Sequence, residues 1–390
     1  MTAAVTVEVI RERWRMGLES RALVMVTAVL LVIGLVTVYS ATEIVAQQQN
    51  RTSSHYLTKQ LAGAAVGIFV FAFCAKFDAE RYRRVAWWVM GAALVAMLAV
   101  LINSTAFNGS RRFLVGTAVQ PSEFAKLAVI IWTAMLAAKK GEQLRKLGKG
   151  LFPFLIVNGA LAFLAALEPD ISVALFYIAL MGAMLFIAGA RVGHFLLLGL
   201  ILTPVAWTRM NGYAKCRIAD WREQLPAVGC AADLDLQTRQ SMIAIGSGKM
   251  FGVGFSEGRQ QGGFLPFQYT DFIGSNIGEE WGFFGLFVIV TFFSLYALLG
   301  FRIARDARSQ FLQLVAVGLT LTTVITAFVH LAVITGLFPN TGLTLPFISY
   351  GRSNLIISLA MTGILVNIGS TRERVYSDAM PDPILGAGAR

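Results

Sequence analysis

The sequence predicts an all-α integral membrane protein with ten transmembrane helices and a large extracytoplasmic loop between the seventh and the eighth helix. Of its 390 residues, 56% are hydrophobic and 14% are charged, and the mean hydropathy of +0.66 is too high for a soluble globular protein. Apolar runs long enough to cross a hydrocarbon layer recur along the whole chain. Lys and Arg are concentrated in alternate connections between these runs, which is typical of cytoplasmic loops.

Length and apolar character define the predicted spans. The first run is too long for the core of a signal peptide, and no small-residue cleavage site follows it, so we assign it as a span. The ten spans cover residues 22–46, 57–76, 85–103, 120–138, 151–168, 171–190, 193–208, 273–301, 310–337 and 345–369. Residues 1–390 are therefore interpreted as a single membrane domain.

The cations orient the chain in the membrane. The cation-rich connections include Arg11, Arg13, Lys76, Arg81, Lys139, Lys140, Arg302, Arg305, Arg372 and Arg374. The opposite short connections carry only Arg51, Lys59, Arg111 and Arg112. Because Lys and Arg favour the cytoplasmic side, both termini are predicted to be cytoplasmic. The net charge of +11 is then explained by topology, and no nucleic-acid partner is expected. An anionic lipid substrate could also use part of this positive charge.

The segments outside the spans differ in character. Residues 1–20 are basic and favour a short amphipathic helix on the cytoplasmic leaflet, since one helical face holds Val7, Ile10, Trp14 and Leu18. A frayed basic tail is the alternative. Residues 371–390 are predicted as a cytoplasmic tail. Residues 209–272 form the extracytoplasmic loop, in which "QTRQSMIAIGSGKM" predicts a short helix closed by glycines and "GVGFSEGRQQGG" predicts turns.

Cysteine and histidine give no sign of a structural metal. His55, His194 and His330 are scattered, and no two cysteines have CxxC spacing. Cys216 and Cys230 both lie in the long loop, where an oxidising compartment would allow a disulfide. Two free thiols are the equal alternative, because sequence does not give the geometry of the sulfur atoms.

Ionisable residues inside or beside a span are functional candidates. In "GSRRFLVGTAVQPSEFAK", Glu123 and Lys126 are three residues apart and share a helix face after Pro121. Spacing alone favours a structural ion pair. Arg111 and Arg112 lie just upstream, where two guanidiniums could bind a pyrophosphate or simply be solvated among lipid headgroups.

Three carboxylates lie where the long loop enters the eighth span. Asp271 is expected at its mouth, with an N-cap role as the alternative. Glu279 and Glu280 are expected about two turns inside the helix, where they need hydrogen-bonding partners or a water-filled cavity.

Two further polar stretches lie on the predicted outer side. "ALEPDISVAL" is a short turn in which Asp170 can cap the following helix. In "TGLFPNTGLTLPFISYGRSNL", Pro339 and Pro346 break the helix, and the polar residues from Ser349 to Asn354 must line protein or water. Together the polar stretches predict an outward-facing cavity. It suits chemistry on a lipid-linked anionic substrate, and equally a transporter vestibule.

Six segments of the chain resemble the SEDS family, the shape, elongation, division and sporulation proteins. In family order they are "QPSEFAK", "EPDISVAL", "YAKCRI", "QSMIAIGSGKMFGVG", "YTDFIGSNIGEEWG" and "TGLTLPFISYG". The resemblance covers nearly the whole chain. "GLTLPFISYG" and "MFGVGF" are more similar to the division branch than to the elongation branch.

The resemblance implies a peptidoglycan glycosyltransferase that polymerises lipid II outside the bacterial cytoplasmic membrane, together with a class B penicillin-binding protein as transpeptidase and with other membrane proteins of the division or elongation machinery. The essential aspartate of the family falls on Asp271, which would be the general base. Lys126, oriented by Glu123, would receive the leaving pyrophosphate. A divalent cation, Mg²⁺ or Mn²⁺, could share that task. Further substrate contacts are expected from Arg111, Arg112, Arg217, Ser349 and Arg352.

The chain departs from the family pattern around the expected cavity. Phe267, Gln268 and Tyr269 stand where Glu, Ala and His are common, and His330 stands where Asn is frequent. Arg352 in "SYGRSN" is expected to add a cation to the cavity. A lipid transporter and a membrane scaffold for division enzymes are the other two hypotheses, although no internal repeat supports a transporter.

Overall fold

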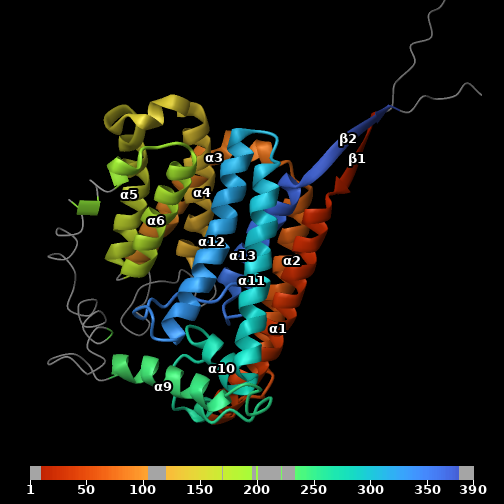
Figure 1. The fold of residues 1–390 in the computed structure, drawn as a ribbon, viewed down its shortest axis with the longest axis vertical. Helices are drawn as coiled ribbons and strands as arrows, with labels where there is room; N and C mark the ends of the chain where they lie inside the picture. The colour runs from red at the N-terminus through yellow and green to blue at the C-terminus, as the bar shows by residue number, and fades with distance from the viewer. Residues whose placement is uncertain are drawn as a thin grey trace, which may run out of the picture.

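The computed structural model describes residues 10–103, 120–168, 170–195, 199–200, 221 and 233–376. Most helices run side by side along one long axis and form a single bundle (Figure 1). Seven helical segments of the described chain are long and apolar enough to cross a membrane, and two shorter apolar helices accompany them. The predicted helical membrane fold is therefore confirmed.

The elements follow the chain in simple order. The helices are α1 (Leu18–Gln48), α2 (His55–Lys76), α3 (Tyr82–Asn103), α4 (Pro121–Lys140), α5 (Phe152–Leu167), α6 (Ile171–Ile187), α9 (Asp233–Gly248), α10 (Ile273–Glu280), α11 (Gly282–Arg305), α12 (Gln310–Ile334) and α13 (Arg352–Ile368). Short helical turns are η1 (Ala79–Arg81), η2 (Gly141–Arg145), η3 (Leu147–Leu151) and η4 (Gln260–Gly262), and the strands are β1 (Ile10–Met16) and β2 (Ser370–Tyr376). Nine predicted spans coincide with helices, the eighth of them with both α10 and α11, whereas span 193–208 lies largely outside the described residues.

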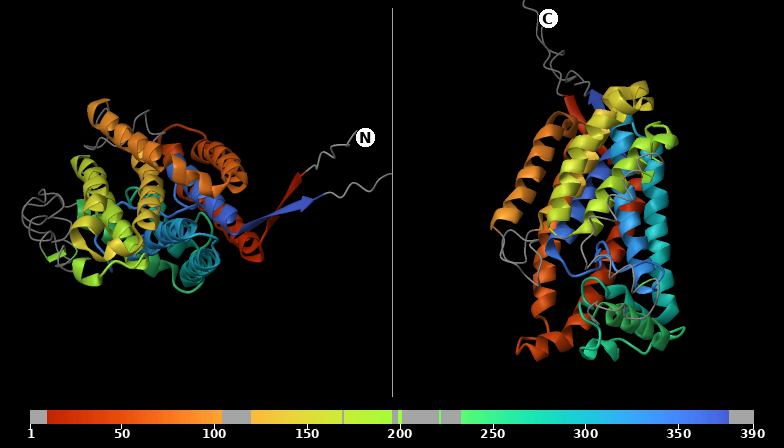
Figure 2. Two further views of the ribbon diagram at one scale, coloured as in Figure 1. Left: turned by 90° about the horizontal axis from the view of Figure 1, so that it is seen from above. Right: turned by 90° about the vertical axis from the view of Figure 1, so that its left-hand side faces the viewer.

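The N-terminal amphipathic helix is a wrong prediction for residues 10–16, which form strand β1. It pairs with β2 in antiparallel register, with Ile10 opposite Tyr376 and Met16 opposite Ser370. The two paired strands, called the strand ribbon below, extend from one end of the bundle, where α1 begins and α13 ends (Figures 1 and 2). Helical periodicity could not reveal this pairing, because the partner strand lies more than 350 residues away in sequence.

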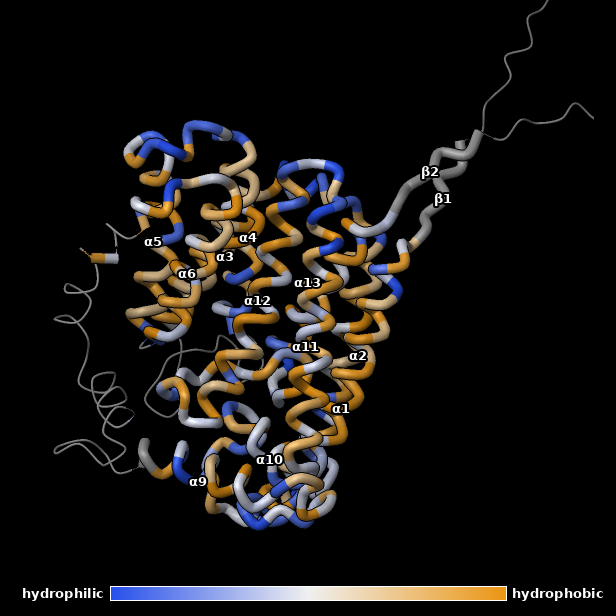
Figure 3. The backbone as a smooth tube through the Cα atoms, viewed as in Figure 1, coloured by the Kyte–Doolittle hydropathy of each residue, from blue (hydrophilic) through white to orange (hydrophobic). Residues whose placement is uncertain are grey.

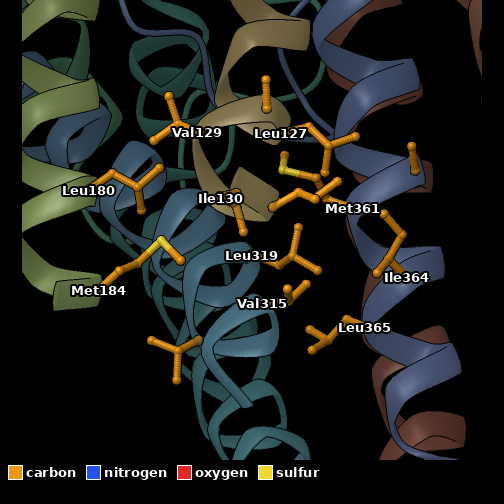
Figure 4. Packing of buried hydrophobic residues seen from close by; sticks show 14 of the residues in the cluster. Leu127, Val129, Ile130, Leu180, Met184, Val315, Leu319, Met361, Ile364 and Leu365 are labelled. Atoms are coloured by element: carbon orange, nitrogen blue, oxygen red, sulfur yellow. The ribbon is translucent and has the colours of Figure 1, made fainter. Parts of the chain in front are cut away.

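Apolar side chains fill the interior between α4, α6, α12 and α13. Figure 4 shows Ile130, Met184, Leu319 and Ile364 meeting there. Helix α4 is the most enclosed candidate span of the described chain, with 83% of its most apolar stretch buried. The outer helices instead expose apolar residues along their middle, with polar residues at both ends of the bundle (Figure 3). Lipid is the solvent that such a surface requires.

Glycine allows close contact between elements, as is usual for helices packed in lipid. A Cβ atom at Gly363 of α13 would lie 2.5 Å from the carbonyl oxygen of Phe71 in α2. A Cβ atom at Gly34 of α1 would lie 2.5 Å from the carbonyl oxygen of Phe347 and 2.6 Å from the Cα of Ile348. Helix α1 therefore packs directly against the backbone that leads into α13.

The predicted eighth span, 273–301, is two helices, and this corrects the sequence prediction. The break is at Gly282, whose φ of +66° is left-handed. The N–H groups of Phe283 and Phe284 donate to the carbonyl oxygens of Lys249 and Met250 in the preceding loop, at 2.9 and 3.2 Å. These contacts start a new helix, so α10 lies beyond the membrane-spanning helix α11. The tenth span is likewise shorter than predicted, since α13 begins only at Arg352.

The helix predicted inside the long loop is confirmed as α9, and turns follow it through residues 249–272. Helix α9 is fixed to the bundle through Ser241, whose hydroxyl donates to the carbonyl oxygen of Ile334 at 2.7 Å and contacts the hydroxyl of Ser275 at 2.6 Å. Helices α9 and α10 lie at the end of the bundle opposite the strand ribbon (Figure 1).

Glu279 and Glu280 are on α10, outside α11, and are buried in protein rather than in lipid. Glu279 accepts hydrogen bonds from the backbone N–H groups of Arg259 at 2.9 Å and Gln260 at 3.3 Å. Glu280 accepts from the Ser40 hydroxyl and the Gln261 amide. The two carboxylates thus fasten the loop to α10 and α1. Burial raises the pKa of both carboxyl groups.

We predict that Gly34→Ala lowers the free energy of unfolding by about 1–3 kcal/mol, because the new methyl group would overlap backbone atoms that have no rotamer to change. The matched control is Gly159→Ala in α5, where an added Cβ meets no atom within 4 Å. Thermal unfolding of both variants in the same lipid nanodiscs measures the difference. Equal melting temperatures for the two variants would contradict the close packing of α1.

We predict that Glu280→Gln weakens the dependence of stability on pH. Since the folded-state pKa of Glu280 is raised, the folded protein holds this proton more tightly than the unfolded chain does. The stabilisation that this bound proton gives is complete below the pKa of Glu280 in the unfolded chain. It is lost as pH rises through the pKa of Glu280 in the folded protein. Melting temperatures between about pH 4.5 and pH 8 should therefore fall less steeply for Glu280→Gln than for the unmodified chain.

Glu257→Gln is the control for that experiment, because it removes an exposed carboxylate from the same loop. It should leave the slope of melting temperature against pH unchanged. Parallel curves for Glu280→Gln and the unmodified chain would rule out a proton bound at Glu280 on folding.

Candidate functional site

Asp271 lies in the turn before α10, where three distant parts of the chain meet. Its side chain is partly exposed. The preceding backbone is held by the segment that leads into α13: the Ser349 hydroxyl donates to the carbonyl oxygen of Thr270 at 2.7 Å, and the Tyr350 N–H donates to that of Tyr269 at 2.9 Å. The N-cap of α10 is Phe272 and no side chain caps it, so Asp271 is not the helix cap.

The carboxylate of Asp271 is close to a turn that needs glycine. Gly342 has a left-handed φ of +68°, and a Cβ atom there would lie 3.6 Å from Asp271 Oδ2. The Asn340 side chain accepts from the Gly342 N–H at 3.1 Å and shapes this turn. Glycine thus leaves open space beside one carboxylate oxygen.

His330 holds the other side of the Asp271 segment. Its ring is buried in α12, its Nε2 accepts from the Gly274 N–H at 3.3 Å, and its Nδ1 lies 2.9 Å from the carbonyl oxygen of Leu343. A backbone N–H only donates and a carbonyl only accepts, so Nδ1 carries the proton and the imidazole is neutral. His330, which stands where the family often has Asn, therefore links α12, α10 and the turn near Asp271.

Ser349 does not offer its side chain to a substrate, which corrects that expectation. It is 1% exposed, and its hydroxyl accepts from the Leu345 N–H at 2.8 Å while it donates to Thr270. Both hydrogen-bonding roles are used inside the chain. Ser349 is a positioning residue for the backbone before Asp271.

Gln60 is a positioning residue that the sequence interpretation missed. Its side-chain amide donates to the carbonyl oxygen of Ser349 at 3.1 Å and accepts from the Gly351 N–H at 3.2 Å. Gln60 is buried one turn into α2, within a predicted span. The available signal was an amide at the start of a predicted span, because a polar group at such a position needs partners.

Arg352 begins α13 and is partly exposed at this end of the bundle. Its stem packs on α2, where a Cβ atom at Gly63 would lie 3.0 Å from Arg352 Cγ. Burial raises the pKa of the neighbouring Tyr350, and the positive charge of Arg352 acts in the opposite direction. The guanidinium is therefore near the Tyr350 hydroxyl, and its contribution of a cation to a substrate cavity stays a prediction.

Glu123 and Lys126 form the ion pair that their spacing predicts. Lys126 Nζ lies 2.7 and 2.9 Å from the two carboxylate oxygens of Glu123. Both side chains are buried, and the ammonium also lies 5.5 Å from the centre of the Phe176 ring. In this structure the pair lies inside the bundle.

Hydrogen bonds join the start of α4, next to the ion pair, to α13 and to α6. The Gln120 N–H, just before α4, donates to the Ser353 hydroxyl at 3.0 Å. The Tyr177 hydroxyl of α6 donates to the carbonyl oxygen of Ser122 at 2.7 Å. Asp170 caps α6 as predicted, since its carboxylate accepts from the Val173 N–H at 3.4 Å. The stretch before α4 is thus bonded to the start of α13, and α6 is bonded to the first turn of α4.

Several predicted residues lie outside the part of the chain that the structure describes. These are Arg111, Arg112, Arg217, Cys216 and Cys230. In the described ranges, no group of three or more His, Cys, Asp or Glu side chains is arranged to hold a metal ion. The chemistry that the described site supports is proton transfer to a partly exposed carboxylate on a fixed backbone.

Comparison with known proteins gives the family. The cell cycle protein model for FtsW, RodA and SpoVE matches residues 21–374. A protein of Trichlorobacter lovleyi named probable peptidoglycan glycosyltransferase FtsW is 36% identical, over 93% of this chain and 96% of that protein. Stage V sporulation protein E of Bacillus subtilis is 33% identical, over 89% of this chain and 95% of that protein.

Solved structures share the fold. A chain from a study described as the structural coordination of polymerization and crosslinking by a peptidoglycan synthase complex has a TM-score of 0.73 at 24% identity, covering 89% of this chain and 96% of that chain. The rod shape determining protein RodA of Thermus thermophilus has a TM-score of 0.63 at 24% identity, covering 89% of this chain and 95% of that chain. The resemblance seen in the sequence motifs is confirmed, and the chain belongs to the FtsW/RodA/SpoVE family of cell cycle proteins.

Proposed function

We propose that this protein is a peptidoglycan glycosyltransferase that polymerises lipid II at the outer face of a bacterial cytoplasmic membrane during cell division. The observation that carries the proposal is Asp271, a partly exposed carboxylate on a backbone fixed from both α12 and the α13 segment. The names of the relatives and the division-type motifs support the same reaction and branch.

The proposed topology has ten spans, cytoplasmic termini and an extracytoplasmic loop at 209–272. The helix ends near the strand ribbon support it, because they carry Lys76, Arg81, Lys139, Lys140, Arg302 and Arg305. That end is cytoplasmic by the positive-inside rule. The end with α9, α10 and Asp271 then faces outward, where a lipid-linked saccharide would be polymerised.

The reaction needs a base and a stabilised leaving group. Asp271 accepts the proton of an acceptor sugar hydroxyl as the oxygen attacks the anomeric carbon of the donor. The glycosidic bond forms through an oxocarbenium-like transition state while the bond to the pyrophosphate breaks. Lys126, together with Arg111, Arg112 or Arg217, would balance the charge that develops on the pyrophosphate.

Mg²⁺ or Mn²⁺ could share this neutralisation. The described residues offer no ligand cluster for such an ion, so no step is assigned to it. A class B penicillin-binding protein is the proposed partner for cross-linking. The shared fold with a chain of a peptidoglycan synthase complex supports that pairing.

We predict that Asp271→Asn lowers the rate of lipid II polymerisation by about 10²–10⁴-fold, because the amide keeps the shape of the carboxylate but cannot take a proton. The assay uses the purified chain with a partner transpeptidase that lacks glycosyltransferase activity. The amount of glycan product is quantified on gels. Melting temperature and partner binding serve as controls for folding. Equal product from both proteins would place the base elsewhere.

A second prediction separates structural from chemical roles of the buried ion pair. Lys126→Met alone should destabilise the fold by about 3–5 kcal/mol, because it leaves the Glu123 carboxylate buried without its cation. Adding Glu123→Gln should restore much of the stability. If Lys126 serves the pyrophosphate, the double variant is stable but still polymerises poorly. Recovery of both stability and polymerisation would make the pair purely structural.

A further inference from the structure

We propose that Tyr56, Tyr269 and Tyr350 form an aromatic surface that binds the acceptor saccharide beside Asp271. The inference deepens the proposed function and rests on it, since it assigns the sugar whose hydroxyl gives its proton to Asp271. It adds three residues that neither the motifs nor the spacing of the sequence had singled out as substrate contacts.

The three rings come from distant parts of the chain and meet at one place. Tyr56 is in the first turn of α2, Tyr269 precedes α10, and Tyr350 precedes α13. The ring centre of Tyr56 lies 5.4 Å from that of Tyr269 and 5.4 Å from that of Tyr350, and the latter two are 5.7 Å apart. All three side chains are only partly buried, so the cluster has solvent-facing aromatic surface.

Backbone contacts fix the cluster in place. Tyr350 N–H donates to the carbonyl oxygen of Tyr269 at 2.9 Å, which joins two of the three segments. Gln60, one turn after Tyr56, bonds the backbone on both sides of Tyr350 at 3.1 and 3.2 Å. Preorganisation of this kind reduces the entropy cost of binding a ligand.

The cluster is adjacent to the proposed base. Tyr269 is two residues before Asp271, and the intervening Thr270 carbonyl oxygen accepts the Ser349 hydroxyl at 2.7 Å. Burial, followed by the nearby Tyr56, Tyr350 and Asp271, raises the pKa of the Tyr269 hydroxyl. A sugar with a hydroxyl on Asp271 would therefore have its ring within reach of the Tyr269 and Tyr350 side chains.

The chemistry of the cluster fits a saccharide better than a lipid chain or a free phosphate. Aromatic faces carry partial negative charge and attract the weakly positive C–H groups of a sugar ring. The Tyr56 hydroxyl already donates to Gln49 Oε1 at 2.8 Å, whereas those of Tyr269 and Tyr350 can bond sugar hydroxyls and acetamido groups. A lipid tail would leave those hydroxyls unsatisfied, and a phosphate would be repelled by the ring faces.

Two arginines lie near the tyrosines. Arg352 and Arg51 both act on the Tyr350 hydroxyl, in the direction opposite to burial. Arg51 is exposed and Arg352 is partly exposed. An acceptor that carries an anionic group beyond its sugar can extend towards these guanidiniums while the sugar stays on the rings.

The test measures binding without turnover. The probe is the soluble disaccharide N-acetylglucosaminyl-N-acetylmuramic acid, titrated against the full chain in nanodiscs by saturation-transfer NMR. Tyr269→Leu and Tyr350→Leu keep apolar volume but remove the flat ring, and each should raise the dissociation constant about three- to tenfold. Tyr269→Phe keeps the ring and should bind more tightly than Tyr269→Leu.

Tyr82→Leu is the matched control, because Tyr82 is a partly buried tyrosine at the start of α3, at the opposite end of the bundle. It should leave binding unchanged. Melting temperatures identify any variant that fails to fold. If a Leu variant does not fold, the comparison of Tyr269→Phe with the unmodified chain tests the inference, because this variant keeps the ring and should retain binding. No saccharide signal for the unmodified chain, or equal affinity in all the variants, would overturn the inference.

The measurements distinguish a failure of this inference from a failure of the proposed reaction. The unmodified chain could polymerise lipid II while the tyrosine variants bind the disaccharide as tightly as it does. In that case the proposed reaction stands and the aromatic surface is overturned. If the tyrosine variants weaken binding and the chain makes no glycan, the surface stands and the glycosyltransferase proposal fails.

Discussion

The hydrogen bond from the Ser349 hydroxyl to the carbonyl oxygen of Thr270 is the contact on which the arrangement of the site depends. It fixes the residue next to Asp271 to a segment that is itself non-helical and therefore needs support. Gln60 supports that segment from α2, and the close approach of Gly34 supports it from α1. The helices of the bundle thus support the short non-helical segment before α13, and that segment fixes the backbone that carries the Asp271 carboxylate.

The low dielectric of the surroundings explains why so many polar groups at this end are bonded to one another. A buried carboxylate without partners would be costly, so Glu279 takes backbone N–H groups and Glu280 takes a hydroxyl and an amide. The same constraint explains Gln60 and His330, which satisfy backbone groups that no regular helix or strand would satisfy. Asp271 differs from Glu279 and Glu280 in being partly exposed. That difference is what a base needs if it is to meet a substrate.

The sequence predicted those features that depend on neighbours along the chain. Apolar run length predicted the helices, three-residue spacing predicted the Glu123–Lys126 pair, and helix-start chemistry predicted the Asp170 cap. It failed where a distant segment decides the local structure. The break at Gly282 depends on carbonyl groups of Lys249 and Met250, and strand β1 depends on β2. The tyrosine cluster was hidden for the same reason, since its three residues meet only after α2, the long loop and α13 have packed together.

The structure is better prepared for the acceptor of the proposed reaction, at Asp271, than for the pyrophosphate of the donor, at Lys126. On the acceptor side, Asp271 is partly exposed, the backbone before it is fixed, and the tyrosine cluster includes Tyr269, two residues before it. On the donor side, Lys126 is 3% exposed and bonds both oxygens of Glu123. A pyrophosphate can use that ammonium only if the ion pair opens or the anion replaces the carboxylate as its partner. Since separating a buried pair costs several kcal/mol, the donor itself, or a protein bound to the bundle, must supply the compensating interactions. A chain built in this way would hold its acceptor readily and react only when the donor has also been accommodated.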